Sequence, residues 1–149
     1  MSFGLTTLRS LSRQDVTLLM RAAGLLIATE SRLRLEKLRR RSLDIRPFLK
    51  STVPIAGRRR TVDPEQVILA VNRVSRTLGI GTCLSRALVS ARLLRGRGSH
   101  VVVRVGVRKD GDRLVAHAWV EGPSVVFSEG NGPRGHAPLI LRGPLGTLE

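Results

Sequence analysis

The chain has few of the residues that form disulfides or metal clusters. Its 149 residues include one cysteine, Cys83, which excludes an internal disulfide framework and a zinc site built from cysteine pairs. The three histidines, His100, His117 and His136, show no close metal-ligand spacing, so we expect neither a metal nor a cofactor. A free thiol persists in a reducing compartment, which indicates a cytoplasmic protein.

Long apolar runs are also lacking. The segment from Leu18 to Ala28 is interrupted by Arg21 and is too short to span a bilayer. The segment begins too far from the N-terminus and has no convincing cleavage site, which argues against a secretory signal.

Acidic and aromatic residues are scarce. Lys and Arg number 26 against 11 Asp and Glu, a formal net charge of +15 that would attract nucleic acid, anionic lipid or acidic peptides. With one Trp, three Phe and no Tyr, little is available for base stacking, and no recognition motif accompanies the charge. A basic nucleic-acid-binding protein is therefore only the alternative hypothesis. We expect no specific nucleic-acid partner.

The length fits one domain with extensions, and its first part is helical. Helical periodicity covers residue 12 to about 40, with Ser12 as N-cap and Asp15 as its capping-box partner. The apolar residues expected on its buried stripe are Val16, Leu19, Ala23, Leu26 and Ile27. The basic end, "SRLRLEKLRRR", fits a solvated helix C-terminus, or alternatively peripheral contact with an anionic membrane.

Proline, glycine and charge mark the next segment as a connector. Residues 44–61 contain Pro47, Pro54 and the cluster Arg58, Arg59, Arg60. We therefore divide the chain into an N-terminal helical extension with its connector (1–60), a core (61–129) and a Gly/Pro-rich tail (130–149).

Two further helices open the core. Asp63 and Pro64 predict a capped helix start, and Gly79 predicts the end of that helix. Its expected buried stripe is Val67, Val71, Val74 and Leu78. Gly81 or Thr82 caps the next helix, which places Cys83 in its first turn. Its expected stripe is Leu84, Leu88, Ala91 and Leu94.

Alternating apolar residues then predict strands. The ranges are 100–107, 114–121 and 124–128, joined by turns at 109–112 and at Gly122-Pro123. Helices followed by an antiparallel meander indicate an α+β fold.

Cys83 and His117 are the candidate reactive pair. Unpaired backbone N–H groups at a helix N-terminus stabilise a thiolate, and a neighbouring imidazole can complete its activation. His117 lies in the apolar strand "VAHAWV", where a polar ring needs a partner. Taken alone, Cys83 could be a small buried apolar residue and His117 a satisfied core histidine.

A third residue would orient the imidazole through its other nitrogen. Glu129, at the end of the third strand, is the first candidate. Ser128 and Glu121 are alternatives, and Asp112 in the turn is less well placed. Each of these could equally be a solvated surface group.

The stretch "CLSRALVSARLLRGRGSHVVVRVGVRKDGDRLVAHAWVEGP" resembles the transglutaminase-like leader peptidases of lasso-peptide biosynthesis. The shared features are a Cys-Leu-x-Arg-Ala helix, an "LLRRRG"-type helix end, a "GV" strand and an "AHAWVE" strand. The resemblance covers roughly Pro64 to Pro123. It implies a papain- or transglutaminase-like core with Cys83 as nucleophile and His117 as general base. The family usually has Asp as third residue; here no Asp follows Asp112, and Glu129 is the conservative substitute.

The resemblance also implies a function and partners. The chain would be a cysteine peptidase that removes the leader from a ribosomally made precursor, before an ATP-dependent cyclase closes the macrolactam. These 149 residues leave no room for the leader-recognition domain of fused relatives, so a separate recognition protein is expected. Arg58, Arg59 and Arg60 and the basic first helix are candidate docking surfaces for that protein or for an acidic leader, or are simply solvated. A transglutaminase-like acyltransferase or a catalytically inactive scaffold is the remaining alternative.

Overall fold

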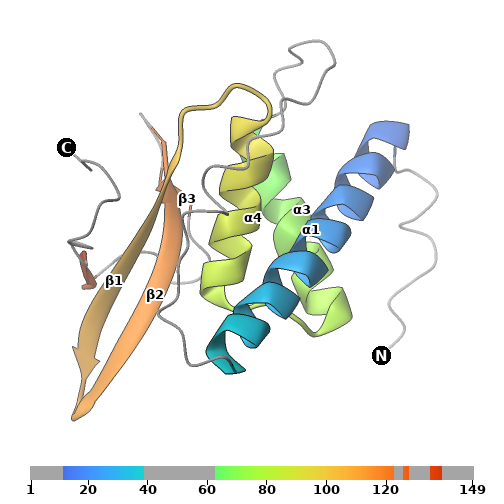
Figure 1. The fold of residues 1–149 in the computed structure, drawn as a ribbon. Coiled ribbons are helices and arrows are strands. Elements are labelled where there is room, and N and C mark those ends of the chain that lie inside the picture. Colours follow the sequence, from blue (N-terminus) through green and yellow to red (C-terminus); the bar gives the residue numbers. More distant parts are fainter. Residues whose placement is uncertain (1–11, 39–62, 123–125, 128–134, 139–149) are drawn as a thin grey trace, which may run out of the picture.

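The computed structural model describes residues 12–38, 63–122, 126–127 and 135–138 (Figure 1). Its helices are α1 (Arg13–Leu38), α3 (Pro64–Leu78) and α4 (Cys83–Arg95). Its strands are β1 (Val102–Asp110), β2 (Arg113–Glu121), β3 (Val126–Phe127) and β4 (Ala137–Pro138). The strands form one antiparallel sheet in the order β3-β2-β1-β4. The α+β prediction, with an N-terminal helix before the core, is confirmed.

Helix α4 is the central element of the molecule. It packs against β1 and β2 on one side and against α1 and α3 on the other (Figure 1). Residues from every layer are fully buried around it: Leu26, Val67, Val71, Leu94 and Val120. Complete burial of one such side chain stabilises a fold by about 1.5–3 kcal/mol. The first turn of α4, which carries Cys83, is therefore held from both sides.

The predicted helix starts are confirmed. At α1, the Ser12 backbone N–H and hydroxyl donate to the Asp15 carboxylate at 3.0 and 2.7 Å, and the Asp15 N–H donates to the Ser12 hydroxyl at 3.2 Å. At α3, the Glu65 N–H donates to the Asp63 carboxylate at 3.0 Å. Gly79 ends α3 in the left-handed conformation at φ 63°, which glycine adopts without steric cost.

The predicted buried stripes were wrong at three positions. Val16 and Ile27 on α1 are 47% and 50% exposed, and Leu78 at the end of α3 is 46% exposed. The residues of α1 that are buried are Leu18, Ala22, Leu26, Thr29 and Glu30. Because the first three are spaced four residues apart, the packed apolar strip on α1 is narrow, and the neighbouring apolar residues fall outside it.

Strands β1 and β2 form a long hairpin closed by Gly111 and Asp112. Asp110 pairs with Arg113, so β1 runs further toward the turn than residues 100–107. Gly111 has a φ of +59°, which suits glycine in a two-residue turn. Strand β4 lies within the segment expected as a tail: Ala137 and Pro138 pair with Val107 and Gly106 of β1.

Candidate active site

The start of α4 is fixed by a tight turn and a capping box. Gly81 has a φ of +102°, and a Cβ there would lie 3.0 Å from the Ser75 hydroxyl and 3.3 Å from a methyl of Leu26. Thr82 is the N-cap: its hydroxyl accepts from the Ser85 N–H at 3.3 Å, and its own N–H donates to the Ser85 hydroxyl at 2.8 Å. Cys83 is consequently the first residue of the helix.

Cys83 is a half-buried free thiol. As the first helical residue, it has a backbone N–H outside the i to i−4 hydrogen-bond ladder, like the N–H groups next to it. Such groups stabilise negative charge at the helix start, on the sulfur or on a substrate oxygen. The location therefore suits a nucleophile.

His117 lies on β2 opposite Gly106 of β1. Its ring is stacked near Trp119, with centroids 6.3 Å apart and an interplanar angle of 17°. The ring of His136, just before β4, lies 5.5 Å away at an angle of 39°. Burial lowers the pKa of His117 below its ordinary value, and the charges of His136 and Arg86 lower it further. This lowering of the pKa favours the neutral form of His117, which can accept a proton.

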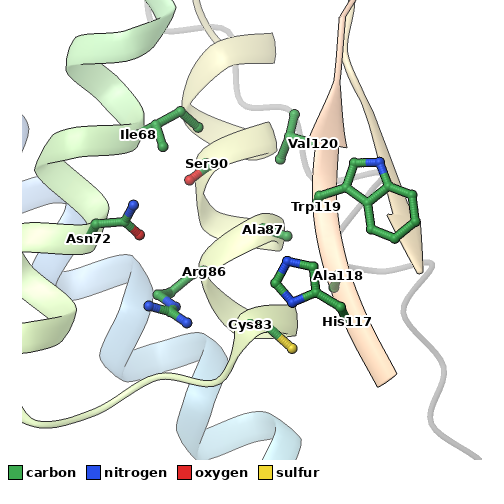
Figure 2. Close-up of a pocket in the computed structure, with 10 residues that line it drawn as sticks. All are labelled: Ile68, Asn72, Cys83, Arg86, Ala87, Ser90, His117, Ala118, Trp119 and Val120. Atoms are coloured by element: carbon green, nitrogen blue, oxygen red, sulfur yellow. The ribbon is translucent and has the colours of Figure 1, made fainter. Parts of the chain in front are cut away.

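Cys83 and His117 line the same cavity, which has a volume of about 30 Å³ (Figure 2). The cavity lies among α3, α4 and β2, and its lining residues are Ile68, Asn72, Cys83, Arg86, Ala87, Ser90, His117, Ala118, Trp119 and Val120. This space holds roughly one or two water molecules. A larger molecule would therefore lie outside the cavity, with only a small group at its mouth.

Two of the candidates for the third residue are described, and neither is placed against His117. The Glu121 carboxylate accepts from Arg104 Nε and from Trp119 Nε1, both at 2.8 Å. Asp112 is exposed in the hairpin turn. It lies five residues before His117, which corresponds to about 16 Å along an extended strand. Glu129 and Ser128 lie outside the described residues, as does the Arg58 to Arg60 cluster.

Two residues that the sequence reasoning missed contact this site. Arg86 lies one turn beyond Cys83 and lines the cavity. It could have been found, because residues three apart share a helix face. His136 has no such local signal, since only the pairing of β4 with β1 brings it near His117.

Within the described ranges, no group of three or more His, Cys, Asp and Glu side chains could hold a metal ion. The helices described here are also not apolar over a long enough stretch to cross a membrane.

The family model of the transglutaminase-like superfamily matches residues 25–139. This range contains most of α1, the α3–α4 pair and the sheet, and it includes Cys83, His117 and His136. No curated protein and no solved structure matches the chain.

Proposed function

Because the chain belongs to the transglutaminase-like superfamily, whose domain fits a cysteine protease or an acyltransferase, we propose that it is a cysteine peptidase acting through Cys83 and His117. One observation carries this proposal: the thiol at the start of α4 and the imidazole of β2 line one cavity. A nucleophile beside a base is the arrangement that acyl transfer to a thiol requires.

The chemistry follows from this pair. His117 takes the proton of the Cys83 thiol as the sulfur bonds to the carbonyl carbon of the scissile peptide, and the Cys83 backbone N–H donates to the oxyanion that forms. The carbon–nitrogen bond breaks as the His117 imidazolium gives its proton to the departing amine, which leaves a thioester. Water then adds to the thioester and gives a proton to His117. The carbon–sulfur bond breaks, and His117 returns the proton to the sulfur. The product leaves as a carboxylic acid, which loses its proton to the solvent and becomes a carboxylate.

The proposed substrate is a ribosomally made lasso-peptide precursor, cut between leader and core. The support is the combination "CLSRAL", "LLRGRG" and "AHAWVE" within residues 83–121. A separate recognition protein would bring the leader, and an ATP-dependent cyclase would then use the free amine of the core. The reaction is proposed to take place in the cytoplasm.

The basic end of α1 is a proposed docking surface for the recognition protein or leader, together with Arg58 to Arg60. Arg32, Arg34 and Lys37 are exposed there. Ion pairs on the same helix, Arg32 with Glu36 at 3.3 Å and Arg34 with Glu30 at 3.4 Å, offset part of the charge. The same surface is a candidate for peripheral contact with anionic lipid.

The test is cleavage of a cognate lasso-peptide precursor, with and without its recognition protein. We expect a core peptide with a free amine and a leader with a free carboxylate, identified by mass. Cys83→Ala and His117→Ala should each lower the rate by orders of magnitude. His100→Ala is the matched control, since His100 is an exposed histidine outside the cavity, and it should keep full activity.

Full activity of Cys83→Ala would overturn the mechanism. A product in which the acyl group has moved to an amine rather than to water would show an acyltransferase instead. Glu129→Ala beside Ser128→Ala tests the third residue predicted from sequence: a large loss in Glu129→Ala alone would assign it that role.

A further inference from the structure

Helix α1 has a second apolar face, on the side away from α3 and α4. Its buried residues Leu18, Ala22 and Leu26 lie on the side that packs against those two helices. The opposite side carries residues that are spaced three or four apart, and all of them are exposed: Val16, Met20, Gly24, Ile27, Ser31, Leu35 and Leu38. We call these residues the outer strip.

The outer strip is long and continuous. Met20, Leu35 and Leu38 are each more than half exposed, and Val16 and Ile27 are about half exposed. At the rise of an α-helix, the distance from Val16 to Leu38 is roughly 33 Å. Single exposed apolar residues are common on protein surfaces, but a continuous apolar strip marks an interaction surface. The strip is long enough for a partner helix of about 20 residues.

A groove with a volume of about 320 Å³ adjoins the middle of the outer strip. Its lining residues are Ile27, Glu30, Ser31, Arg34, Leu78 and Ile80. Ile27 and Ser31 belong to the strip, whereas Leu78 and Ile80 form the other wall at the end of α3 and just after it. A large side chain that projects from a helix on the strip can enter this groove, which is how amphipathic helices anchor in apolar grooves.

Both borders of the outer strip are basic. Arg21 and Arg32 lie along one border, and Arg34 and Lys37 lie along the other. The carboxylate of Glu30, on the second border, already accepts from Arg34 Nε at 3.4 Å within the same helix. The whole chain has a formal net charge of +15. A helix with acidic residues on both sides of its apolar face is therefore complementary to this surface.

Charge and shape favour an acidic helix over the two other occupants that such a strip can have. A second copy of this chain would bring the arginines of two α1 helices together, and like charges are unfavourable at an interface. An anionic membrane would contact the outer strip, but its flat surface would not fill the groove between Ile27 and Leu78.

We propose that the outer strip and the groove beside it form a docking site for an amphipathic helix of a partner polypeptide, with Asp or Glu on both sides of its apolar face. One large apolar side chain of that helix fills the groove. The C-terminal end of α1 and the start of α4 lie at the same end of the molecule (Figure 1), so one end of the docked helix lies toward Cys83. The proposal goes beyond the proposed function, because it concerns binding and requires no reaction.

The first test is binding of a synthetic peptide, measured by fluorescence anisotropy in about 0.15 M salt to screen non-specific attraction. The peptide is a designed helix of about 20 residues with Leu on one face and Glu on both sides of it. In the double variant Ile27→Ser with Leu35→Ser, we expect Kd to rise about tenfold or more, because the apolar contact is lost.

The matched control is the double variant Leu69→Ser with Leu114→Ser. It removes two exposed leucines from α3 and β2, leaves the net charge unchanged and should keep the wild-type Kd. Equal losses in the two double variants would overturn the proposal. Equal binding of a peptide whose Leu residues are replaced by Gln would also overturn it, because binding would then depend on charge alone.

The second test concerns the basic borders. Arg21→Gln with Lys37→Gln removes one charge from each border and should raise Kd for the Glu-flanked peptide, because the complementary charge is lost. The control is Arg73→Gln with Arg113→Gln, which removes the same charge from exposed positions on α3 and β2. An equal rise of Kd in this control would contradict a localised docking site.

Two measurements address the other occupants. We expect the wild-type protein to sediment as a monomer over a range of concentrations and not to bind vesicles of phosphatidylcholine and phosphatidylserine. A dimer that is lost in Ile27→Ser with Leu35→Ser would assign the strip to a second copy of the chain. Vesicle binding that is lost in the same variant would assign it to a membrane. Either result would overturn the proposal.

A last measurement needs no variant that might unfold. The chain has two methionines, Met1 and Met20, and Met20 lies on the outer strip. In wild-type protein labelled with ¹³C-methyl methionine, we expect the methyl signal of Met20 to shift when the Leu peptide is added but not when its Gln version is added. An unchanged Met20 signal at saturating peptide would overturn the proposal. Because these measurements involve no cleavage, their failure is distinguishable from failure of the proposed function.

Discussion

Arg86 places a positive charge beside the two groups on which the proposed reaction depends. It lines the cavity with Cys83 and His117, one helical turn after the thiol. After burial and His136, its charge is the third cause of the lowered pKa of His117. A cation in this place disfavours the imidazolium form of His117.

Replacing Arg86 tests this directly. In Arg86→Gln the cation is lost, and we expect the pKa of His117 to rise toward its ordinary value, because the protonated ring is no longer repelled. The measurement is an NMR titration of the imidazole. Arg92→Gln, on the same helix but outside the cavity, is the control. An unchanged midpoint in Arg86→Gln, or an equal shift in Arg92→Gln, would contradict the assignment.

At the level of single residues, the sequence predicted the parts of the site that have a local signal. Cys83 follows a recognisable cap, and His117 is a polar residue in an apolar strand; the structure brings them to one cavity. Arg86 also has a local signal, because it lies one helical turn after Cys83. His136 could not be found this way, because its place depends on a pairing between strands about 30 residues apart.

Among the elements, β1 depends on a glycine at the centre of the sheet. Gly106 lies beneath the Trp119 ring and beside the Ala137 carbonyl. The indole is fixed at its other end, since Nε1 donates to Glu121 at 2.8 Å. The ring therefore cannot move aside without breaking a hydrogen bond, and the position has no space for a side chain.

Gly106→Ala should therefore destabilise the fold by about 1–3 kcal/mol, the usual effect of overpacking. Denaturant unfolding gives the free energy, and fluorescence of the single Trp reports the displaced ring. The control is Gly24→Ala on an exposed face of α1, where nothing lies within 4 Å of the added Cβ. Gly24→Ala should raise the free energy of unfolding by about 0.5–1 kcal/mol, because Ala is the better helix former. Equal stability of the two variants would show that the contact at Gly106 is not tight.

The elements themselves differed in how well the sequence predicted them. Helix ends were predictable because Ser12, Asp63 and Gly79 act on their own neighbours. The buried side of α1 could not be predicted in the same way. Its apolar residues lie on several sides of the helix, and the packing of α3 and α4 determines which of them are buried. Strand β4 has only two residues, one of them Pro, so it shows no alternation of apolar and polar residues from which a strand could be predicted.

Across the whole molecule, two shifted groups make the fold sensitive to acid. The folded-state pKa of His117 is below the ordinary 6.5, so the unfolded chain binds its proton first and stability falls as pH drops through 6.5. Burial raises the pKa of Glu121, but hydrogen bonds from Arg104 and Trp119 and the charge of Arg104 outweigh it and lower the pKa below 4.5. Stability therefore falls again as pH drops below 4.5.

Measurements of the melting temperature as a function of pH should resolve these two pH ranges in which stability falls. His117→Gln should flatten the curve just below pH 6.5, and Glu121→Gln should lower Tm at neutral pH and flatten the curve below 4.5. His100→Gln, at an exposed position, should reproduce the wild-type curve. If the slope below pH 6.5 persists unchanged in His117→Gln, the acid sensitivity has another source.

Most of the fold is held by contacts between neighbours in sequence. Helices α3 and α4 and the β1–β2 hairpin follow one another from Pro64 to Glu121, whereas β4 reaches back from residue 137 to pair with Gly106 and Val107. Local contacts form faster than those that close a long loop. During synthesis, Cys83 and its helix can be in place while the edge carrying His136 has yet to be translated. A nascent chain thus carries its thiol before the imidazole pair exists, and the pair is complete only once β4 has left the ribosome.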